Sequence, residues 1–429
     1  MASGKQNLLD SPLLKAVRSR RNLWRAWFHV YPRAAASNDV KSRKAAAAFR
    51  QDAAGHIDQL QRKLASGTFE FLPQKGVAKR RGKKARRPIV VAPLENRIVQ
   101  RAILQTLQYP PVGSKKRLSE ITKILSTPTS VGGLPGKGVP DAVRLISSAL
   151  ANGATHYFRS DIRGFFTAIS KSKVLDLLSE VIGDAGFVEL FSKALHVELE
   201  NEEAVREWID LFPLGEVGVP QGSALSTLSG NLLLREFDKR MNQNGLVMVR
   251  YIDDFVVLTK SGRAATQAAK KCASMLKVLG LDIYEPSAGS KKAALGEVST
   301  GFDFLSFRFR GSEIAPTREA KQKLLKKVRD EIAAAKREIR RNPSEARRVE
   351  PRYVQALNAI DQRTCGWGDS FRHVTRRLEF EQLDIEISSE MIAFENWFSK
   401  FRSGLNEKEG RRALGVALLA DTSREKPHE

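Results

Sequence analysis

Two adjacent aspartates, Asp253 and Asp254, stand inside an otherwise apolar run at residues 247–258. The β-forming residues on both sides predict two short strands with the aspartates at the turn between them. Ionised carboxylates side by side repel each other and are costly to desolvate unless cations compensate their charge. Oxygen ligands of this kind suit Mg²⁺. Taken alone, an Asp-Asp pair is more often a solvated surface turn, so the rest of the chain decides between these interpretations.

A third carboxylate, Asp161, follows a second strand-like segment at 157–162. Two separated carboxylate sites at strand ends are what a two-metal phosphoryl-transfer centre requires. The three aspartates are therefore a candidate catalytic centre for chemistry on phosphates.

The net charge of +24 over 429 residues favours a polyanionic partner, either nucleic acid or an anionic membrane. No apolar stretch approaches the roughly 20 residues that span a bilayer. Arginines interrupt the N-terminal apolar segment, which therefore lacks the core of a signal peptide. Cys272 and Cys365 are the only cysteines, too few for a disulfide framework or a zinc site, so we expect a cytoplasmic protein. Nucleic acid is the better partner, and no membrane partner is expected.

The elements expected around the aspartates alternate between strands and helices, which predicts an α+β protein with helices behind a mainly antiparallel sheet. Upstream, residues 1–70 are expected to be helical, with Trp24 and Trp27 in core packing rather than base stacking. Asp141 is expected to cap a helix that ends at Leu150. The remaining expected elements are a strand at 157–162, helices at about 171–182 and 223–240, a hairpin at 247–259, a helix at 263–279, a strand at 281–284 and a basic helix at 317–341.

A run of basic residues from Lys79 to Arg87 precedes a strand-like segment at 88–93. A charge run is usually a solvated loop, but this one lies between two ordered segments. A hairpin tip or loop that lies on phosphates is the alternative, and both interpretations stay open from local sequence.

Several motifs occur in a fixed order along the chain: Arg87-Pro-Ile-Val-Val, Asn96-Arg-Ile-Val-Gln, Asp161, Pro220-Gln-Gly, Tyr251-Ile-Asp-Asp and Gly301-Phe-Asp-Phe-Leu-Ser-Phe. In this order the chain resembles the bacterial reverse transcriptases of the group II intron and retron lineage, most densely from Arg87 to about Arg310. The resemblance implies a right-hand polymerase, with fingers, an antiparallel palm sheet and an α-helical thumb. The implied segments are an N-terminal helical extension (1–70), fingers (71–155), palm with part of the fingers inserted (156–312), and thumb with the C-terminal region (313–429).

The resemblance also implies the chemistry, in which a primer 3′-hydroxyl attacks the α-phosphate of a dNTP. Asp161, Asp253 and Asp254 would be catalytic, and they would hold two Mg²⁺ ions together with the carbonyl of Ile162; Mn²⁺ can replace Mg²⁺. Phe166 would lie under the sugar and exclude a 2′-hydroxyl, the alternative being that it only packs in the palm. The residues implied to bind the nucleotide are Arg87, Phe166, Gln221, Gly222, Lys291 and Lys292.

Contacts with the template and primer are implied for the fingertip, the aspartate turn, the primer-grip hairpin and the thumb. Phosphate contacts of this kind need not depend on sequence. The residues concerned are Lys79, Arg80, Arg81, Lys83, Lys84, Arg86, Arg97, Tyr251, Phe304, Lys323 and Lys327.

What is missing from the sequence favours one subgroup of the family. No Cys/His cluster of a zinc-bearing endonuclease follows the thumb segment, and the thumb signature of retron enzymes, Val-Thr-Gly, is absent. This pattern resembles the solitary "unknown group" reverse transcriptases, many of which serve in antiviral (phage) defence. They copy a structured non-coding RNA that is encoded nearby into cDNA. Two alternatives stay open: a maturase-like RNA-binding protein of the group II intron type, and a protein-primed or untemplated DNA polymerase.

Overall fold

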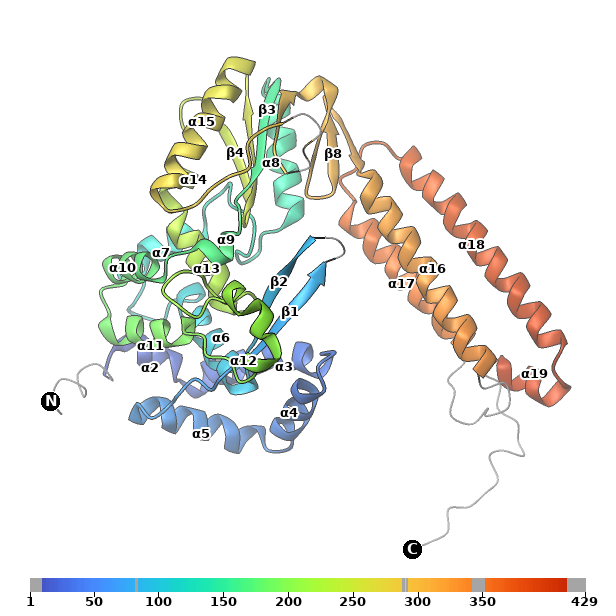
Figure 1. Cartoon of the computed structure of the whole chain (residues 1–429), viewed down its shortest axis with the longest axis horizontal. Coiled ribbons are helices and arrows are strands. Elements are labelled where there is room, and N and C mark those ends of the chain that lie inside the picture. The colour runs from blue at the N-terminus through green and yellow to red at the C-terminus, as the bar shows by residue number, and fades with distance from the viewer. Residues whose placement is uncertain (1–9, 82–83, 288–289, 291, 342–351, 415–429) are drawn as a thin grey trace, which may run out of the picture. The chain divides into compact units, whose positions relative to one another are not determined.

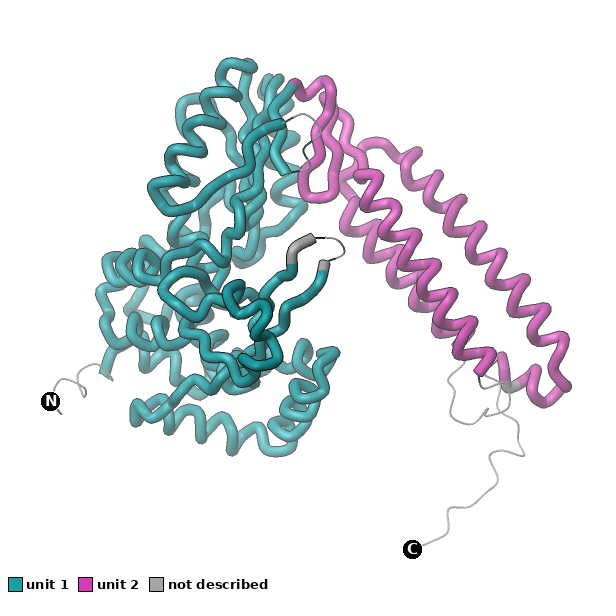
Figure 2. Tube along the Cα trace, viewed as in Figure 1, with its two compact units in different colours: residues 1–296 teal, residues 297–429 magenta. Residues whose placement is uncertain are grey.

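The computed structural model describes residues 10–81, 84–287, 290, 292–341 and 352–414. The chain divides into two compact units, residues 1–296 and residues 297–429 (Figure 2). The division into four segments that the resemblance implies stays a prediction.

The first unit begins with helices whose N-termini are capped by polar side chains. Ser19, Asp39 and Asp52 each accept a hydrogen bond from a backbone N–H of the helix that follows. The Trp27 ring is buried and stacks on Phe49 with 4.4 Å between ring centroids, as the core-packing interpretation predicted. The bounds are α2 (Pro12–Val17), α3 (Arg20–Ala35), α4 (Val40–Gln51) and α5 (Ala53–Ser66).

The basic run lies in a β-hairpin, which confirms the hairpin interpretation of its local structure. Strands β1 (Lys75–Arg81) and β2 (Lys84–Val91) pair antiparallel, with Lys79 opposite Arg87 (Figure 1). The helices that follow are α6 (Leu94–Gln108), α7 (Ser119–Leu125) and α8 (Val139–Ala151).

The cap expected at α8 is wrong in its position. The N-cap is Gly138, and the Asp141 carboxylate accepts a hydrogen bond from the Gly138 N–H at 2.8 Å. Pro140 can occupy the first turn because its missing N–H would have no helical partner there, so the helix starts earlier than a cap at Asp141 allows.

The central sheet has the strand order β4-β5-β3-β6, and its β3–β5 and β4–β5 pairs are antiparallel. Helix α15 packs on β3 and β5, and α8 packs on β4 and β5. The bounds are β3 (His156–Asp161), β4 (Val247–Tyr251), β5 (Asp254–Thr259), α15 (Gly262–Val278) and β6 (Ala294–Glu297).

Between β3 and β4 lies a helical insertion that carries much of the core. The helix expected at 223–240 is two helices, because the chain turns at Leu234 after α13. The strand expected at 281–284 is wrong, since only an isolated bridge joins Ile283 to Ile162 there. The bounds are α9 (Phe165–Ala168), α10 (Lys171–Ile182), α11 (Ala185–Leu195), α12 (Glu202–Val205), the 3₁₀ helix η1 (Arg206–Leu211), α13 (Ala224–Leu233) and α14 (Arg235–Arg240).

The second unit consists of a small antiparallel sheet, β7-β8-β9, and long helices. Its core includes Val328, Ile360 and Phe394 from α16, α17 and α18. The bounds are η2 (Val298–Thr300), β7 (Phe302–Phe304), β8 (Phe307–Arg310), β9 (Glu313–Pro316), α16 (Arg318–Arg341), α17 (Arg352–Ser370), α18 (Leu378–Ser403) and α19 (Glu407–Ala413).

The predicted fold class is confirmed: helices combine with antiparallel sheets, and a helical C-terminal region follows. Within the described residues, no helix is both long enough and apolar enough to cross a bilayer.

Candidate active site

The aspartates predicted to be catalytic meet at one end of the central sheet. Asp161 is the last residue of β3 and lies directly opposite Asp254, the first residue of β5. Side chains of directly opposed residues project from the same face of a sheet. The Ile162 N–H donates to the carbonyl of Asp253 at 3.0 Å, which ties the β3 end to the β4–β5 turn. The fold therefore brings the backbone of all three aspartates to one end of the sheet, with the side chains of Asp161 and Asp254 on the same face.

The β4–β5 turn has an unusual backbone at Ile252. Its φ is +62°, in the left-handed region, which costs a β-branched residue about 1–3 kcal/mol. Gly132, in the loop before α8, lies against the turn, and a Cβ there would come within 2.4 Å of the Ile252 nitrogen. This close approach explains why glycine stands at residue 132.

Burial makes the paired aspartates poor anions in the absence of a compensating cation. It raises the pKa of Asp254 to about 7, with Arg159 acting in the opposite direction and Asp253 in the same direction. Burial also raises the pKa of Asp253, and the positive charges of Arg87 and Arg250 oppose that rise. The site therefore holds carboxylates that a divalent cation would stabilise in their ionised form.

The oxygen-only donor set fits Mg²⁺, and the predicted ligands Asp161, Ile162, Asp253 and Asp254 lie on the two segments joined at the β3 end. In this arrangement the Lys292 ammonium forms an ion pair with Asp161. No group of three or more His, Cys, Asp or Glu side chains stands in metal-binding geometry within the described residues. Metal binding therefore stays a prediction that the chemistry of the donors supports.

The predicted nucleotide-binding residues Arg87, Gln221 and Gly222 are brought together by the β1–β2 hairpin. The Val90 N–H donates to the Gln221 carbonyl at 3.0 Å, and Arg87 Nε donates to the Gln221 side chain. Gly222 has a φ of +119°, and a Cβ there would meet the Val90 carbonyl at 2.9 Å. Glycine is therefore required where the loop touches β2.

Phe166 lies in α9, between the β3 end and the same loop. Its carbonyl accepts a hydrogen bond from the Val219 N–H at 2.7 Å, and its half-buried ring packs on Phe165 with 5.4 Å between centroids. The ring therefore contributes to the core, and its remaining exposure is compatible with the predicted contact to a sugar.

Two residues near Asp161 were missed by sequence reasoning. Tyr284 donates its backbone N–H to the Asp161 carbonyl at 3.3 Å, and its ring makes cation–π contacts with two side chains. The guanidinium of Arg163 is 4.8 Å and the ammonium of Lys292 is 5.2 Å from the ring centroid. The only sequence signal was the presence of an aromatic residue close to a lysine predicted to bind the nucleotide.

The residues predicted to contact the template and primer are spread over both units. In the first unit, Lys79 and Arg80 are exposed, whereas Arg86 stacks on Trp208 at 4.4 Å and Tyr251 is half-buried at the end of β4. Arg97 lines a separate cavity of about 170 Å³ that also contacts Lys75 and Glu200.

In the second unit, Lys323 and Lys327 are exposed on α16, but the Phe304 ring is only 2% exposed and packs in the core. Lys83 and Lys291 lie outside the described residues, and for Arg81 and Lys84 only the backbone is described, as a pair in the hairpin.

Comparison with known proteins assigns a family. Residues 73–309, more than half of the chain, match the family model described as "Reverse transcriptase (RNA-dependent DNA polymerase)". Protein YkfC of Escherichia coli is 24% identical over 290 residues, which cover 58% of this chain and 70% of that protein.

A second relative is the "Uncharacterized 91 kDa protein in cob intron" of Schizosaccharomyces pombe, 27% identical over 186 residues. The match covers 43% of this chain but only 20% of that protein. Among solved structures, telomerase from Candida albicans in complex with a telomeric RNA fragment aligns with a TM-score of 0.40 and 13% identity, over 78% of this chain and 58% of that one.

Proposed function

Because the chain belongs to the reverse transcriptase family, we propose that it is an RNA-directed DNA polymerase that extends a primer with dNTPs along an RNA template. The observation that carries the proposal is the meeting of Asp161 with Asp253 and Asp254 at the end of β3 and β5. Half-buried aspartates gathered at one sheet end, two of them with a pKa raised by burial, are costly in a purely structural role. They are useful where cations and phosphates gather.

Each part of the site has a role in this reaction. When bound, two Mg²⁺ ions would supply activation of the 3′-hydroxyl and charge stabilisation at the leaving phosphates. Arg87 and Gln221 would orient the incoming nucleotide, because the hairpin and the loop hold them together. The Phe166 ring would exclude a 2′-hydroxyl and so select dNTPs.

The test is primer extension on an RNA template by the purified protein. Asp253→Ala should abolish extension, because it removes a carboxylate that the reaction needs, while the affinity for primer–template should change little. The control Asp58→Ala removes a half-exposed carboxylate on α5 that pairs with Arg20 and should leave extension intact. Normal elongation by Asp253→Ala would refute the assignment.

We further propose that the template is one structured non-coding RNA encoded nearby, that the protein acts in the bacterial cytoplasm, and that the cDNA serves phage defence. The support is the resemblance of the sequence to solitary defence enzymes. The experiment is to express the gene with its flanking DNA and to sequence the nucleic acids that copurify. One dominant RNA, with complementary DNA that disappears in Asp253→Ala/Asp254→Ala, is the expected result; a mixture of unrelated RNAs would contradict it.

The relative named for a cob intron favours a second candidate, a maturase-like protein that binds a structured intron RNA. Such a function would survive the loss of Asp253 and Asp254, because RNA folding needs no phosphoryl transfer. Bound RNA without DNA, unchanged in the double variant, is the result that would favour this candidate.

A further inference from the structure

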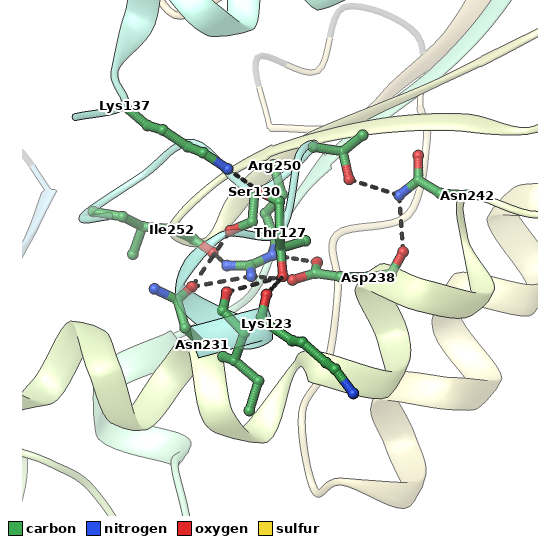
Figure 3. A network of polar contacts seen from close by, with 11 residues as sticks. Lys123, Thr127, Ser130, Lys137, Asn231, Asp238, Asn242, Arg250 and Ile252 are labelled. Carbon is green, nitrogen blue, oxygen red and sulfur yellow. Dashed lines mark hydrogen bonds and ion pairs between the residues drawn. The ribbon is translucent and has the colours of Figure 1, made fainter. Parts of the chain in front are cut away.

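An arginine is buried in the strand that leads to the catalytic turn. Arg250 belongs to β4 and is fully buried, yet an unpaired guanidinium is very costly to desolvate. Asp238 of α14 compensates it in a two-pronged ion pair: Nε donates to Oδ1 at 2.7 Å and Nη2 donates to Oδ2 at 2.5 Å (Figure 3). Nη2 also donates to Oδ1 of Asn231 in α13 at 3.0 Å. Two helices therefore fix the position of the guanidinium.

The remaining guanidinium nitrogen contacts the β4–β5 turn, which carries Asp253. Nη1 of Arg250 donates to the carbonyl of Ile252 at 2.7 Å. The backbone of Arg250 is held as well, because its N–H donates to Thr129 and its carbonyl accepts from Val131, both at 2.9 Å. The contact to Ile252 is thus made by a side chain that has little freedom to move.

This contact matters for Asp253 because Ile252 supplies the peptide group that precedes it. The carbonyl before Asp253 is held by Arg250, and its own carbonyl is held by the Ile162 N–H at 3.0 Å. Both peptide groups that flank Asp253 are therefore fixed. Ile252 would otherwise favour a negative φ, and a change of its φ from +62° would rotate the peptide and redirect the Asp253 carboxylate.

We infer that Arg250, held by Asp238 and Asn231, is a positioning residue that keeps Ile252 in its left-handed conformation and so aims the Asp253 carboxylate. The inference deepens the proposed polymerase function and rests on it. A purely structural role is the alternative, since buried ion pairs are common in folded cores. The two roles differ in a testable way, because a buried ion pair can often be replaced by apolar residues of similar volume without loss of stability.

The test compares three variants with the wild type. Arg250→Met/Asp238→Leu replaces the pair with apolar side chains. Arg250→Lys keeps the charge but loses the planar fork that binds both Asp238 oxygens and the Ile252 carbonyl through three separate nitrogens. Leu60→Ala, in the buried face of α5, is the control for loss of stability without any change near the turn. The measurements are melting temperature, kcat and KM for dNTP, and Mn²⁺ affinity by electron paramagnetic resonance.

We expect kcat to fall about 100-fold in both Arg250 variants, since a misplacement near 1 Å has that effect. KM for dNTP should stay within about twofold and Mn²⁺ affinity should fall, while the double variant melts no lower than Leu60→Ala. Wild-type kcat and Mn²⁺ affinity in a folded double variant would overturn the inference. If the double variant does not fold, Arg250→Lys decides by the same two measurements.

The proposed polymerase function can be refuted independently of the role of Arg250. A wild-type protein that binds Mn²⁺ but extends no primer would refute the polymerase, and the Mn²⁺ affinities of the variants would still decide the role of Arg250. Equal affinities in wild type and Arg250→Lys would then count against positioning.

Discussion

Asp254→Asn should make the protein more stable at alkaline pH, and the gain should depend on pH. Burial raises the pKa of Asp254 from its usual 3.8 to about 7 in the folded chain. When the pKa of a carboxyl is higher in the folded state than in the unfolded state, its protonated form stabilises the fold. This contribution to the free energy of unfolding is complete below the unfolded-state pKa and is lost as pH rises through the folded-state pKa. Asparagine does not titrate, so the variant escapes this loss.

The size of the stability gain in Asp254→Asn follows from the pKa shift of Asp254. A rise from 3.8 to about 7 is roughly 3 units, and each unit corresponds to ~1.4 kcal/mol, which gives an upper limit of about 4 kcal/mol above pH 7. About 1.5 kcal/mol of this is already lost at pH 5, because the unfolded carboxyl is ionised there. The stability difference between variant and wild type should therefore grow by about 2–3 kcal/mol between pH 5 and pH 8.

The assay is urea unfolding of both proteins at pH 5, 6, 7 and 8 with a chelator present. The chelator is needed because a divalent cation would favour the ionised carboxylates and reduce the difference. Asp58→Asn is the matched control for the loss of one negative charge at the surface of α5. A stability difference that stays the same from pH 5 to pH 8 would refute the link between burial and charge at Asp254.

Three further predictions concern Phe166, Gly222 and helix α16. Phe166→Ala should raise the ratio of ribonucleotide to deoxyribonucleotide incorporation at least about tenfold in single-nucleotide extension, because the ring no longer excludes a 2′-hydroxyl; an unchanged ratio would contradict its role. Gly222→Ala should destabilise the protein by about 1–3 kcal/mol in urea unfolding, because its Cβ would press on a β2 carbonyl at 2.9 Å, whereas Gly215→Ala has open space and should cost much less; equal losses would argue against the crowding. Lys323→Ala/Lys327→Ala should reduce the slope of log affinity for an RNA–DNA duplex against log salt by roughly two, measured by fluorescence anisotropy, and an unchanged slope would show that these lysines do not contact phosphate.

Local sequence patterns were sufficient to predict those elements in which the spacing of apolar residues matched the buried face. The helix expected at 171–182 is α10, and Asp161 and Asp254 lie at strand ends, as the β-forming residues beside them predicted. The helix expected at 223–240 breaks at Leu234, which is neither proline nor glycine, so its local sequence carries no signal for the turn.

The contacts that support the β4–β5 turn were not predicted from the sequence for a different reason. The sequence analysis gave Arg250 no role, because its partners Asp238 and Asn231 lie on helices whose position relative to β4 only the fold defines. The same holds for Gly132, which is glycine because of a close approach to Ile252. Contacts of this kind depend on distance in space, which periodicity does not encode.

The strand order β4-β5-β3-β6 has a consequence for folding of the chain while the ribosome synthesises it. β3 is synthesised well before β5 and β6, yet it lies between them, so both of its edges lack partners while the helices from α9 to α14 are being made. During that interval the growing chain carries a strand with two unpaired edges, and the three aspartates can come together only after Asp254 has emerged. A chain ended after Arg240 should therefore precipitate or bind chaperones, whereas one ended after Gly296 should stay in solution, as a sedimentation assay would show.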